Sequence, residues 1–113
     1  MTNILFVCSQ NQLSSPTAAA IFAEVEGWNV RSAGTDKDAV RTLTKEDVEW
    51  ADTIVTMELE HKLKIRKNFW HSLKERRQVC FGIPDDYEFM DGKLIEVLKS
   101  YAEKYLDLAA PKN

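Results

Sequence analysis

The chain has 113 residues, of which 44% are apolar and 29% are charged, and its formal net charge is −3. These values are typical of one folded domain, so they argue against a disordered or fibrous chain and against a dedicated nucleic-acid binder, which carries a strong basic excess. With no run of about 18 apolar residues, no secretory signal and only two cysteines, Cys8 and Cys80, we expect one reduced, cytoplasmic domain over residues 1–113, without a membrane span.

The first half of the chain predicts alternating strands and helices. Residues 3–8 form a continuous apolar segment, as in a strand buried on both faces. A helix over residues 17–26 should follow, with Ser15 as its N-cap and Pro16 at its first position. Residues 28–33 predict a second strand. A short helix over residues 44–52 should begin at a capping box formed by Thr44 and Asp47.

The second half continues the alternation. Residues 53–57 are apolar and β-branched and predict a third strand. A long charged helix is expected over residues 58–77, with a break near His71 and Ser72. A fourth strand should span residues 78–81, which would bury Cys80. The last helix, over residues 91–108, is amphipathic.

This alternation predicts an α/β fold, a small doubly wound four-stranded parallel sheet with helices on both faces. In such sheets ligands bind beyond the carboxyl ends of the strands. The loops over residues 8–15 and 82–91 are therefore the candidate functional segments.

The loop after the first strand has a pattern that suits an anion. Cys8 ends the strand, and a polar segment leads directly into a helix N-terminus. Backbone N–H groups of such a loop can converge on a phosphate, and their positive field favours a reactive thiolate. A cysteine facing a bound phosphate can accept a phosphoryl group. A buried structural cysteine explains the loop equally well on this pattern alone.

The segment from Val7 to Ala18 resembles the phosphate loop of the low-molecular-weight protein tyrosine phosphatases. That loop consists of Cys, five residues, Arg and Ser, usually followed by Pro. Residues 31–35 (Arg-Ser-Ala-Gly-Thr), residues 46–52 with Met57 and His61 beyond them, and residues 83–87 (Ile-Pro-Asp-Asp-Tyr) are similar to further motifs of this family in the same order. The likeness spans nearly the whole chain and is greatest to a compact bacterial branch of predicted tyrosine phosphatases.

The resemblance implies a role for each matching residue. Cys8 would attack phosphorus and form a phosphocysteine. Asp85, or alternatively Asp86, would protonate the leaving phenol and then activate water. Tyr87 would line the mouth of the site, and Ser32 would hold Asn11. The implied phosphate loop comprises Ser9, Gln10, Asn11, Gln12, Leu13, Ser14 and Ser15, in which Asn11 would maintain the loop shape and Ser15 would donate to the thiolate.

One departure from the family pattern matters chemically. Ser14 occupies the position of the arginine that clamps two phosphate oxygens, while Gln12 and Ala19 replace residues that are commonly charged. A serine hydroxyl offers one donor and no charge, whereas arginine offers a planar, charged fork. Losing one transition-state donor slows a reaction roughly 10²–10³-fold, and losing a phosphoryl-clamping arginine roughly 10³–10⁵-fold.

Three explanations for Ser14 follow. The protein is a weakened or inactive phosphatase relative, a pseudophosphatase that still binds anions; or position 14 was changed deliberately; or Arg31 or Arg41 replaces the missing side chain. The first is favoured. The expected partners are phosphate, a phosphorylated small molecule or a phosphotyrosine peptide, without a cofactor. A phosphoryl carrier similar to the IIB components of sugar phosphotransferase systems is the alternative of a different class, because carriers need no loop arginine.

The remaining features predict no second site. Basic residues are concentrated between Lys62 and Arg77, and a solvated helix face explains them better than a nucleic-acid patch because the rest of the chain is acidic. His61 and His71 have no cysteine or acidic partner at metal-ligand spacing, so both are expected at the surface, without a metal.

Overall fold

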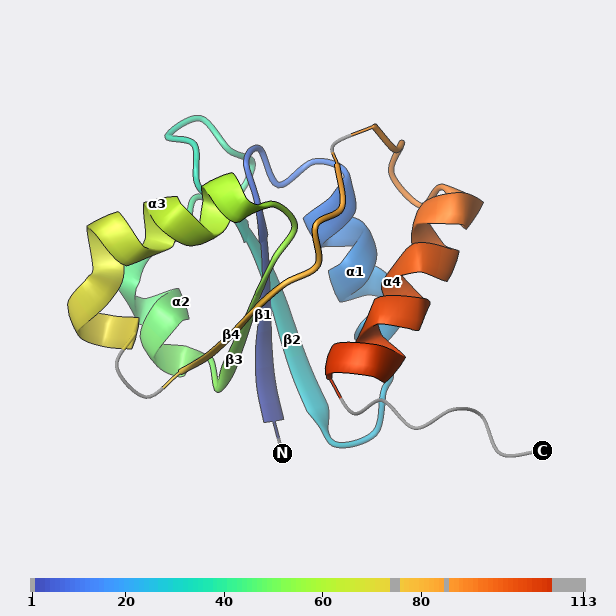
Figure 1. Ribbon diagram of the computed structural model, residues 1–113, viewed down its shortest axis with the longest axis horizontal. Helices are drawn as coiled ribbons and strands as arrows, with labels where there is room; N and C mark the ends of the chain where they lie inside the picture. Colours follow the sequence, from blue (N-terminus) through green and yellow to red (C-terminus); the bar gives the residue numbers. More distant parts are fainter. Residues whose placement is uncertain (1, 74–75, 85, 107–113) are drawn as a thin grey trace.

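The computed structural model describes residues 2–73, 76–84 and 86–106. Strands and helices alternate along the chain as predicted (Figure 1). They are β1 (Thr2–Cys8), α1 (Ser14–Phe22), β2 (Trp28–Gly34), α2 (Lys45–Trp50), β3 (Thr53–Thr56), α3 (Leu59–Phe69), a 3₁₀ turn (Trp70–Leu73), β4 (Arg77–Cys80) and α4 (Gly92–Tyr105).

The strands form one four-stranded sheet in the order β2-β1-β3-β4, and every neighbouring pair is parallel. Helices α1 and α4 cover one face of the sheet, and α2 and α3 cover the other (Figure 1). This arrangement confirms the predicted α/β fold. Because β1 is central and the chain reverses its direction of winding there, the loop after Cys8 lies where ligands bind in such sheets.

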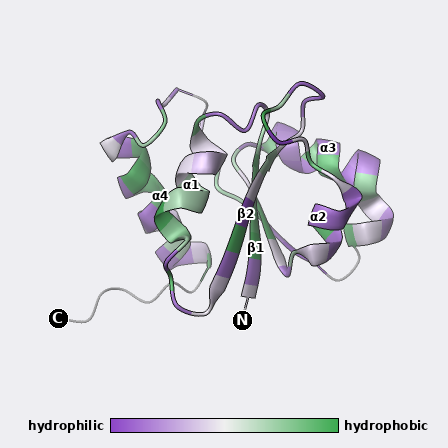
Figure 2. Cartoon of the chain, turned by 180° about the vertical axis from the view of Figure 1, so that it is seen from behind, coloured by the Kyte–Doolittle hydropathy of each residue, from purple (hydrophilic) through white to green (hydrophobic). Residues whose placement is uncertain are grey.

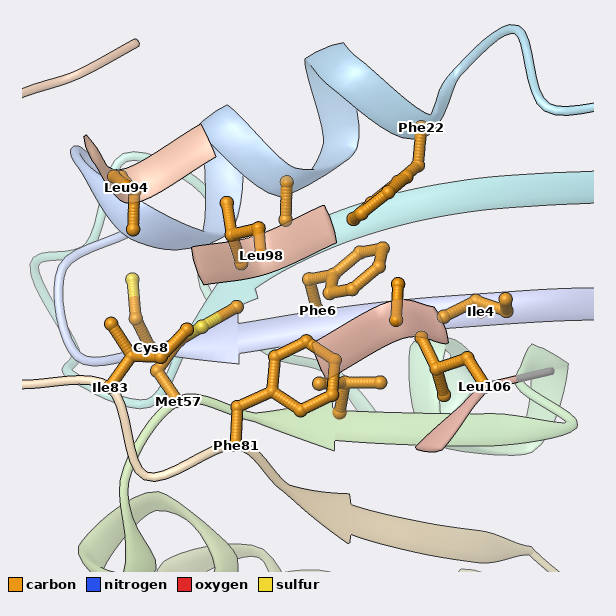
Figure 3. Close-up of a cluster of buried hydrophobic side chains, with 13 residues drawn as sticks. Ile4, Phe6, Cys8, Phe22, Met57, Phe81, Ile83, Leu94, Leu98 and Leu106 are labelled. Atoms are coloured by element: carbon orange, nitrogen blue, oxygen red, sulfur yellow. The ribbon is translucent and has the colours of Figure 1, made fainter. Parts of the chain in front are cut away.

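Each face of the sheet has its own hydrophobic cluster. On the α1 and α4 side, Phe6 stacks on Phe22, with ring centroids 5.6 Å apart. Leu94 and Leu98 of α4 are fully buried in the same cluster, and Cys8 lies at its end beside Met57 and Ile83 (Figure 3). On the α2 and α3 side, the cluster is formed by Leu5, Val7, Ala33, Leu43, Val48, Ala51, Ile54, Ile65 and Leu73.

Local signals account well for α2 and α4. Thr44 and Asp47 form the predicted capping box, in which the Asp47 N–H donates to Thr44 Oγ1 over 3.2 Å and the Thr44 N–H donates to Asp47 Oδ2 over 3.1 Å. Asp91 caps α4 by accepting a hydrogen bond from the Lys93 N–H. Hydrophobic and hydrophilic residues both occur along this helix (Figure 2), as in an amphipathic helix. Both helices therefore begin where short-range hydrogen bonding predicts.

Other boundaries differ from the predictions. Helix α1 begins at Ser14 and ends at Phe22, so Ser15 lies inside the helix and is not its N-cap. Helix α3 ends at Phe69 and tightens into the 3₁₀ turn, close to the predicted break. Cys80 is half-buried rather than buried, because β4 is an edge strand. Within the described ranges, no helix has the length and apolarity needed to cross a membrane.

Candidate phosphate-binding site

Cys8 lies at the carboxyl end of β1, and its side chain is buried against the following loop. Two polar groups reach its sulfur, one from that loop and one from the first turn of α1. The Asn11 backbone N–H donates to Cys8 Sγ over 3.2 Å, and the Ser15 hydroxyl lies 2.9 Å from the same atom. Hydrogen bonds of this kind stabilise a thiolate relative to a thiol. The loop therefore folds around the cysteine and brings the Asn11 N–H and the Ser15 hydroxyl to its sulfur.

The carbonyl groups of the loop are held from the outside. The Cys8, Ser9 and Gln10 carbonyls accept hydrogen bonds from the backbone N–H groups of Thr35, Asp36 and Val40, over 2.9, 3.0 and 2.9 Å respectively. The C=O and the N–H of a trans peptide point in opposite directions. The next N–H groups along the loop therefore face the other way, and the Asn11 N–H indeed points to Cys8 Sγ.

Asn11 has the backbone conformation that this curvature requires, with φ at +57°. Asparagine adopts the left-handed region more readily than most residues. Its side chain donates to Ser15 Oγ over 2.9 Å, so Asn11 and Ser15 hold each other and the cysteine. Ser32, the partner implied by the family resemblance, lies on β2, and its carbonyl accepts from Arg41.

Gly34 allows β2 and the loop to approach closely. A Cβ at this position would lie 2.5 Å from the Ser9 carbonyl oxygen and 2.6 Å from Ala39 Cβ. Side-chain carbons do not approach a backbone oxygen this closely, so only glycine fits here without movement. The glycine within residues 31–35 therefore supports the loop by leaving room for it.

The position of the family's arginine is part of the helix start. Ser14 is the first residue of α1 and is buried, whereas Gln12 is exposed. Arg31 and Arg41 do not replace an arginine here, because both guanidinium groups bind the buried carboxylate of Asp47 on α2. The hypothesis that one of them completes the phosphate site is therefore wrong in this conformation.

The second candidate loop approaches α1. The Met90 N–H donates to Thr17 Oγ1 over 2.9 Å, and the Ile83 N–H donates to the Met57 carbonyl over 2.6 Å. Asp86 is exposed, and Tyr87 packs in part against the hydrophobic cluster on the α1 side. Asp85, the first choice for the general acid, lies outside the described residues.

An ion-pair network lies beside the loop and has no counterpart in the sequence analysis. Gln10 Nε2 donates to Asp36 Oδ2 over 2.7 Å, and Lys64 Nζ lies 3.4 Å from both Asp36 Oδ1 and Glu60 Oε1. Hydrogen bonding to Glu60, and less strongly to Asp36, raises the pKa of Lys64 above its ordinary value. Glu60 and Lys64 have the i,i+4 spacing of an ion pair within one helix. The attachment of Lys64 to Asp36 has no such signal, because α3 and the segment after β2 meet only in the fold.

His61 contradicts the expectation of a surface histidine. It is 2% exposed and lies in the first turn of α3, where Nε2 is 2.9 Å from Ser9 Oγ. His71 is exposed as expected. His61 lies in the first turn of the helix that follows the third strand, at the same sheet edge as the Cys8 loop, and this position was the signal that could have identified it.

No protein-family model matches the chain, and no curated protein matches it by sequence. Solved structures do match. The YwlE arginine phosphatase from Geobacillus stearothermophilus is 22% identical, with a TM-score of 0.68 over 99% of this chain and 100% of its own. The low-molecular-weight protein tyrosine phosphatase SP-PTP from Streptococcus pyogenes is 15% identical, with a TM-score of 0.74 over 93% of each chain.

A third similar structure contains the anion that the loop pattern predicts. The tyrosine phosphatase Wzb from Escherichia coli K30, solved in complex with phosphate, is 20% identical, with a TM-score of 0.73 over 93% of this chain and 99% of its own. These likenesses extend over almost the whole length of both partners. The chain therefore has the fold of the low-molecular-weight protein tyrosine phosphatases.

Proposed function

We propose that this protein binds phosphate monoesters in the Cys8–Ser15 loop and hydrolyses them only weakly. The observation that carries the proposal is the orientation of the loop. Its carbonyls are tied outward to Thr35, Asp36 and Val40, and the Asn11 N–H faces the Cys8 sulfur. Backbone donors arranged in this way bind anions whatever the side chains are. Anion binding is therefore retained without an arginine.

Weak catalysis follows from the donors that are missing. In the proposed reaction, the Cys8 thiolate attacks phosphorus, the bond to the leaving oxygen breaks, and Asp85 or Asp86 gives that oxygen a proton. Water then releases inorganic phosphate from the phosphocysteine. Both steps place negative charge on the equatorial oxygens, and Ser14 supplies no compensating charge there. We therefore expect the protein to act mainly by binding phosphate monoesters and only slightly by hydrolysing them, as a pseudophosphatase does.

A phosphoryl carrier is the second candidate, and the buried Cys8 favours it in one respect. The cysteine is 5% exposed, which would protect a phosphocysteine from water. The two functions differ in the lifetime of this intermediate. A carrier would hold the phosphoryl group until a partner accepts it, whereas a weak phosphatase would release phosphate without a partner. The full-length likeness to phosphatases supports the first function over the carrier.

The substrate class is a further part of the proposal. One similar structure is named an arginine phosphatase and another a tyrosine phosphatase. Phosphotyrosine and phosphoarginine peptides of the same sequence should therefore be compared as competitors for the loop. In this proposal the loop contacts only the phosphate group, so both peptides should bind. The ratio of their two affinities then reports how much the residues at the mouth of the site contribute to binding.

The proposal is tested by protecting Cys8 from alkylation. We expect iodoacetamide to modify Cys8 at pH 6.5 faster than it modifies a simple thiol, because the Asn11 N–H and the Ser15 hydroxyl lie within hydrogen-bond distance of its sulfur. Inorganic phosphate should slow this reaction by occupying the loop. The rate is measured by mass spectrometry of the modified peptide.

Cys80 provides the internal comparison. It is half-buried and lies on β4, which β3 separates from β1, so phosphate should leave its modification unchanged. A Cys80→Ser variant then isolates the signal of Cys8. If Cys8 reacts no faster than a simple thiol and phosphate gives no protection, Cys8 is a structural cysteine and the proposed function is wrong.

A further inference from the structure

His61 connects the first turn of α3 to the phosphate loop. Its ring lies between two partners from different segments: Nε2 is 2.9 Å from the Ser9 side-chain oxygen, and Nδ1 is 3.1 Å from the Glu58 backbone nitrogen. The side chain is almost completely buried. Buried polar groups of this kind are costly when a partner is lost, so the position of the ring constrains both segments.

The backbone partner fixes the direction of both hydrogen bonds. The Glu58 N–H can only donate, so Nδ1 must accept and carry no proton. In the neutral ring the proton is then on Nε2, which donates to Ser9 Oγ. His61 therefore acts as a donor toward the loop and an acceptor toward the start of its own helix.

We propose that His61 is a positioning residue that fixes the Cys8–Ser9 part of the loop for anion binding. The inference rests on the proposed function. The Cys8 and Ser9 carbonyls are held by the segment after β2, through Thr35 and Asp36, and His61 adds an attachment from α3. Since Ser9 directly follows the cysteine, releasing its side chain loosens the peptide that supplies the first N–H of the loop.

Two substitutions separate this role from a structural one. In His61→Asn, the amide oxygen lies near the place of Nδ1 and keeps the bond to Glu58, while the reach to Ser9 is lost. In His61→Gln, the amide nitrogen lies near the place of Nε2 and keeps the bond to Ser9. The readout is the sulfate concentration that halves the rate of Cys8 alkylation, measured in a Cys80→Ser background at constant pH.

We expect His61→Asn to weaken sulfate binding about tenfold, as the loss of one partly buried hydrogen bond does, and His61→Gln to stay within about twofold of the parent. Sulfate is used because its charge does not change near neutral pH. If His61→Gln weakens binding and His61→Asn does not, or if both weaken it equally, His61 serves only to start α3 and the inference is wrong.

Ser9→Ala supplies an independent test, also if His61→Asn does not fold. It should weaken sulfate binding about as much as His61→Asn, and the double variant should be no weaker than either single variant, because both remove the same bond. Unchanged sulfate affinity in a folded Ser9→Ala protein would overturn the inference. Absence of sulfate protection in the parent protein would instead overturn the proposed function.

Discussion

At the scale of single residues, the site consists of a cysteine whose donors come from the backbone and from short side chains. The Asn11 N–H and the Ser15 hydroxyl contact the sulfur, and Asn11 and Ser15 also bind each other. None of these groups carries a full positive charge. Under the proposed function, these groups would therefore balance the substrate charge with dipoles, which favour binding more than phosphoryl transfer.

Restoring the charge at position 14 should restore catalysis. We expect Ser14→Arg to raise the rate of p-nitrophenyl phosphate hydrolysis at least about a hundredfold, because it adds a charged, two-pronged donor to the transition state. Steady-state phosphatase assays measure the gain, and circular dichroism checks the fold.

The matched control places the same charge on the exposed neighbour. Gln12→Arg changes the net charge of the loop equally but leaves the clamping position as serine, so it should give little increase. A folded Ser14→Arg protein without a gain over Gln12→Arg would mean that the catalytic machinery differs from that of active phosphatases at further positions.

At the scale of elements, local sequence signals predicted the strands and most helix starts correctly. The capping box at Thr44 and Asp47 is an example, because it involves groups within a few residues of one another. The start of α4 next to residue 91 is another, and there the structure adds a cap at Asp91. Ser15 shows the limit of such reasoning. Serine is a common N-cap residue, but the Ser15 hydroxyl forms hydrogen bonds with Cys8 and Asn11 instead. The helix begins one residue earlier, at Ser14.

Local sequence signals predicted only part of the candidate site. The loop around Cys8 follows a contiguous pattern, so the sequence predicts its position. The attachments from His61 and from Asp36 join segments far apart in the chain, and no local pattern encodes them. The general acid stays a prediction: Asp85 lies outside the described residues, and Asp86 has only its exposed position to support it.

Gly34 connects two elements and permits a direct test of their contact. We expect Gly34→Ala to lower the free energy of unfolding by about 1–3 kcal/mol, because the added methyl group would overlap the Ser9 carbonyl and Ala39. It should also weaken the protection of Cys8 by phosphate, because the displaced carbonyl belongs to the loop. Urea unfolding and the alkylation assay measure the two effects.

Gly92 is the control for this substitution. A Cβ there meets no atom within 4 Å. Gly92→Ala should therefore leave both the stability and the protection of Cys8 near their original values, or raise the stability slightly through helix propensity. Equal effects of the two substitutions would show that the loop does not depend on the close approach of β2.

At the scale of the whole molecule, one buried carboxylate links three segments of the chain. Asp47 of α2 binds Arg31 of β2 and Arg41 of the following segment, and it caps its own helix through Thr44. Burial alone would raise the pKa of Asp47. The hydrogen bonds from Arg41 and from Thr44 outweigh burial and hold its pKa below the ordinary value of 3.8.

This shift makes the molecule less stable in acid. The unfolded chain binds the Asp47 proton at a higher pH than the folded chain does, so the stabilisation is fully present above pH 3.8 and is lost as the pH falls through the folded pKa. Asp47→Asn should remove this part of the pH dependence. Urea unfolding between pH 3 and 7 measures the free energy of unfolding of the Asp47→Asn and parent proteins. The difference between the two free energies should shrink below about pH 4.

Asp38→Asn serves as the reference, since Asp38 is exposed on the same segment as Arg41. Its free energy of unfolding should follow the parent at every pH. If the free energies of unfolding of the parent and Asp47→Asn proteins changed with pH in parallel from pH 3 to 7, the role assigned to the Asp47 carboxylate would be contradicted.

The ribosome makes the chain from its N-terminus, so the Cys8 loop is synthesised before the groups that hold it in place. Cys8 is translated early, but the backbone groups that hold its loop belong to Thr35, Asp36 and Val40, and the side chain that reaches Ser9 belongs to His61. A nascent chain therefore exposes its cysteine before it can shape an anion site. The thiol is open to oxidants and electrophiles during that interval, and its loop is fully held only after α3 has left the ribosome and packed against the sheet.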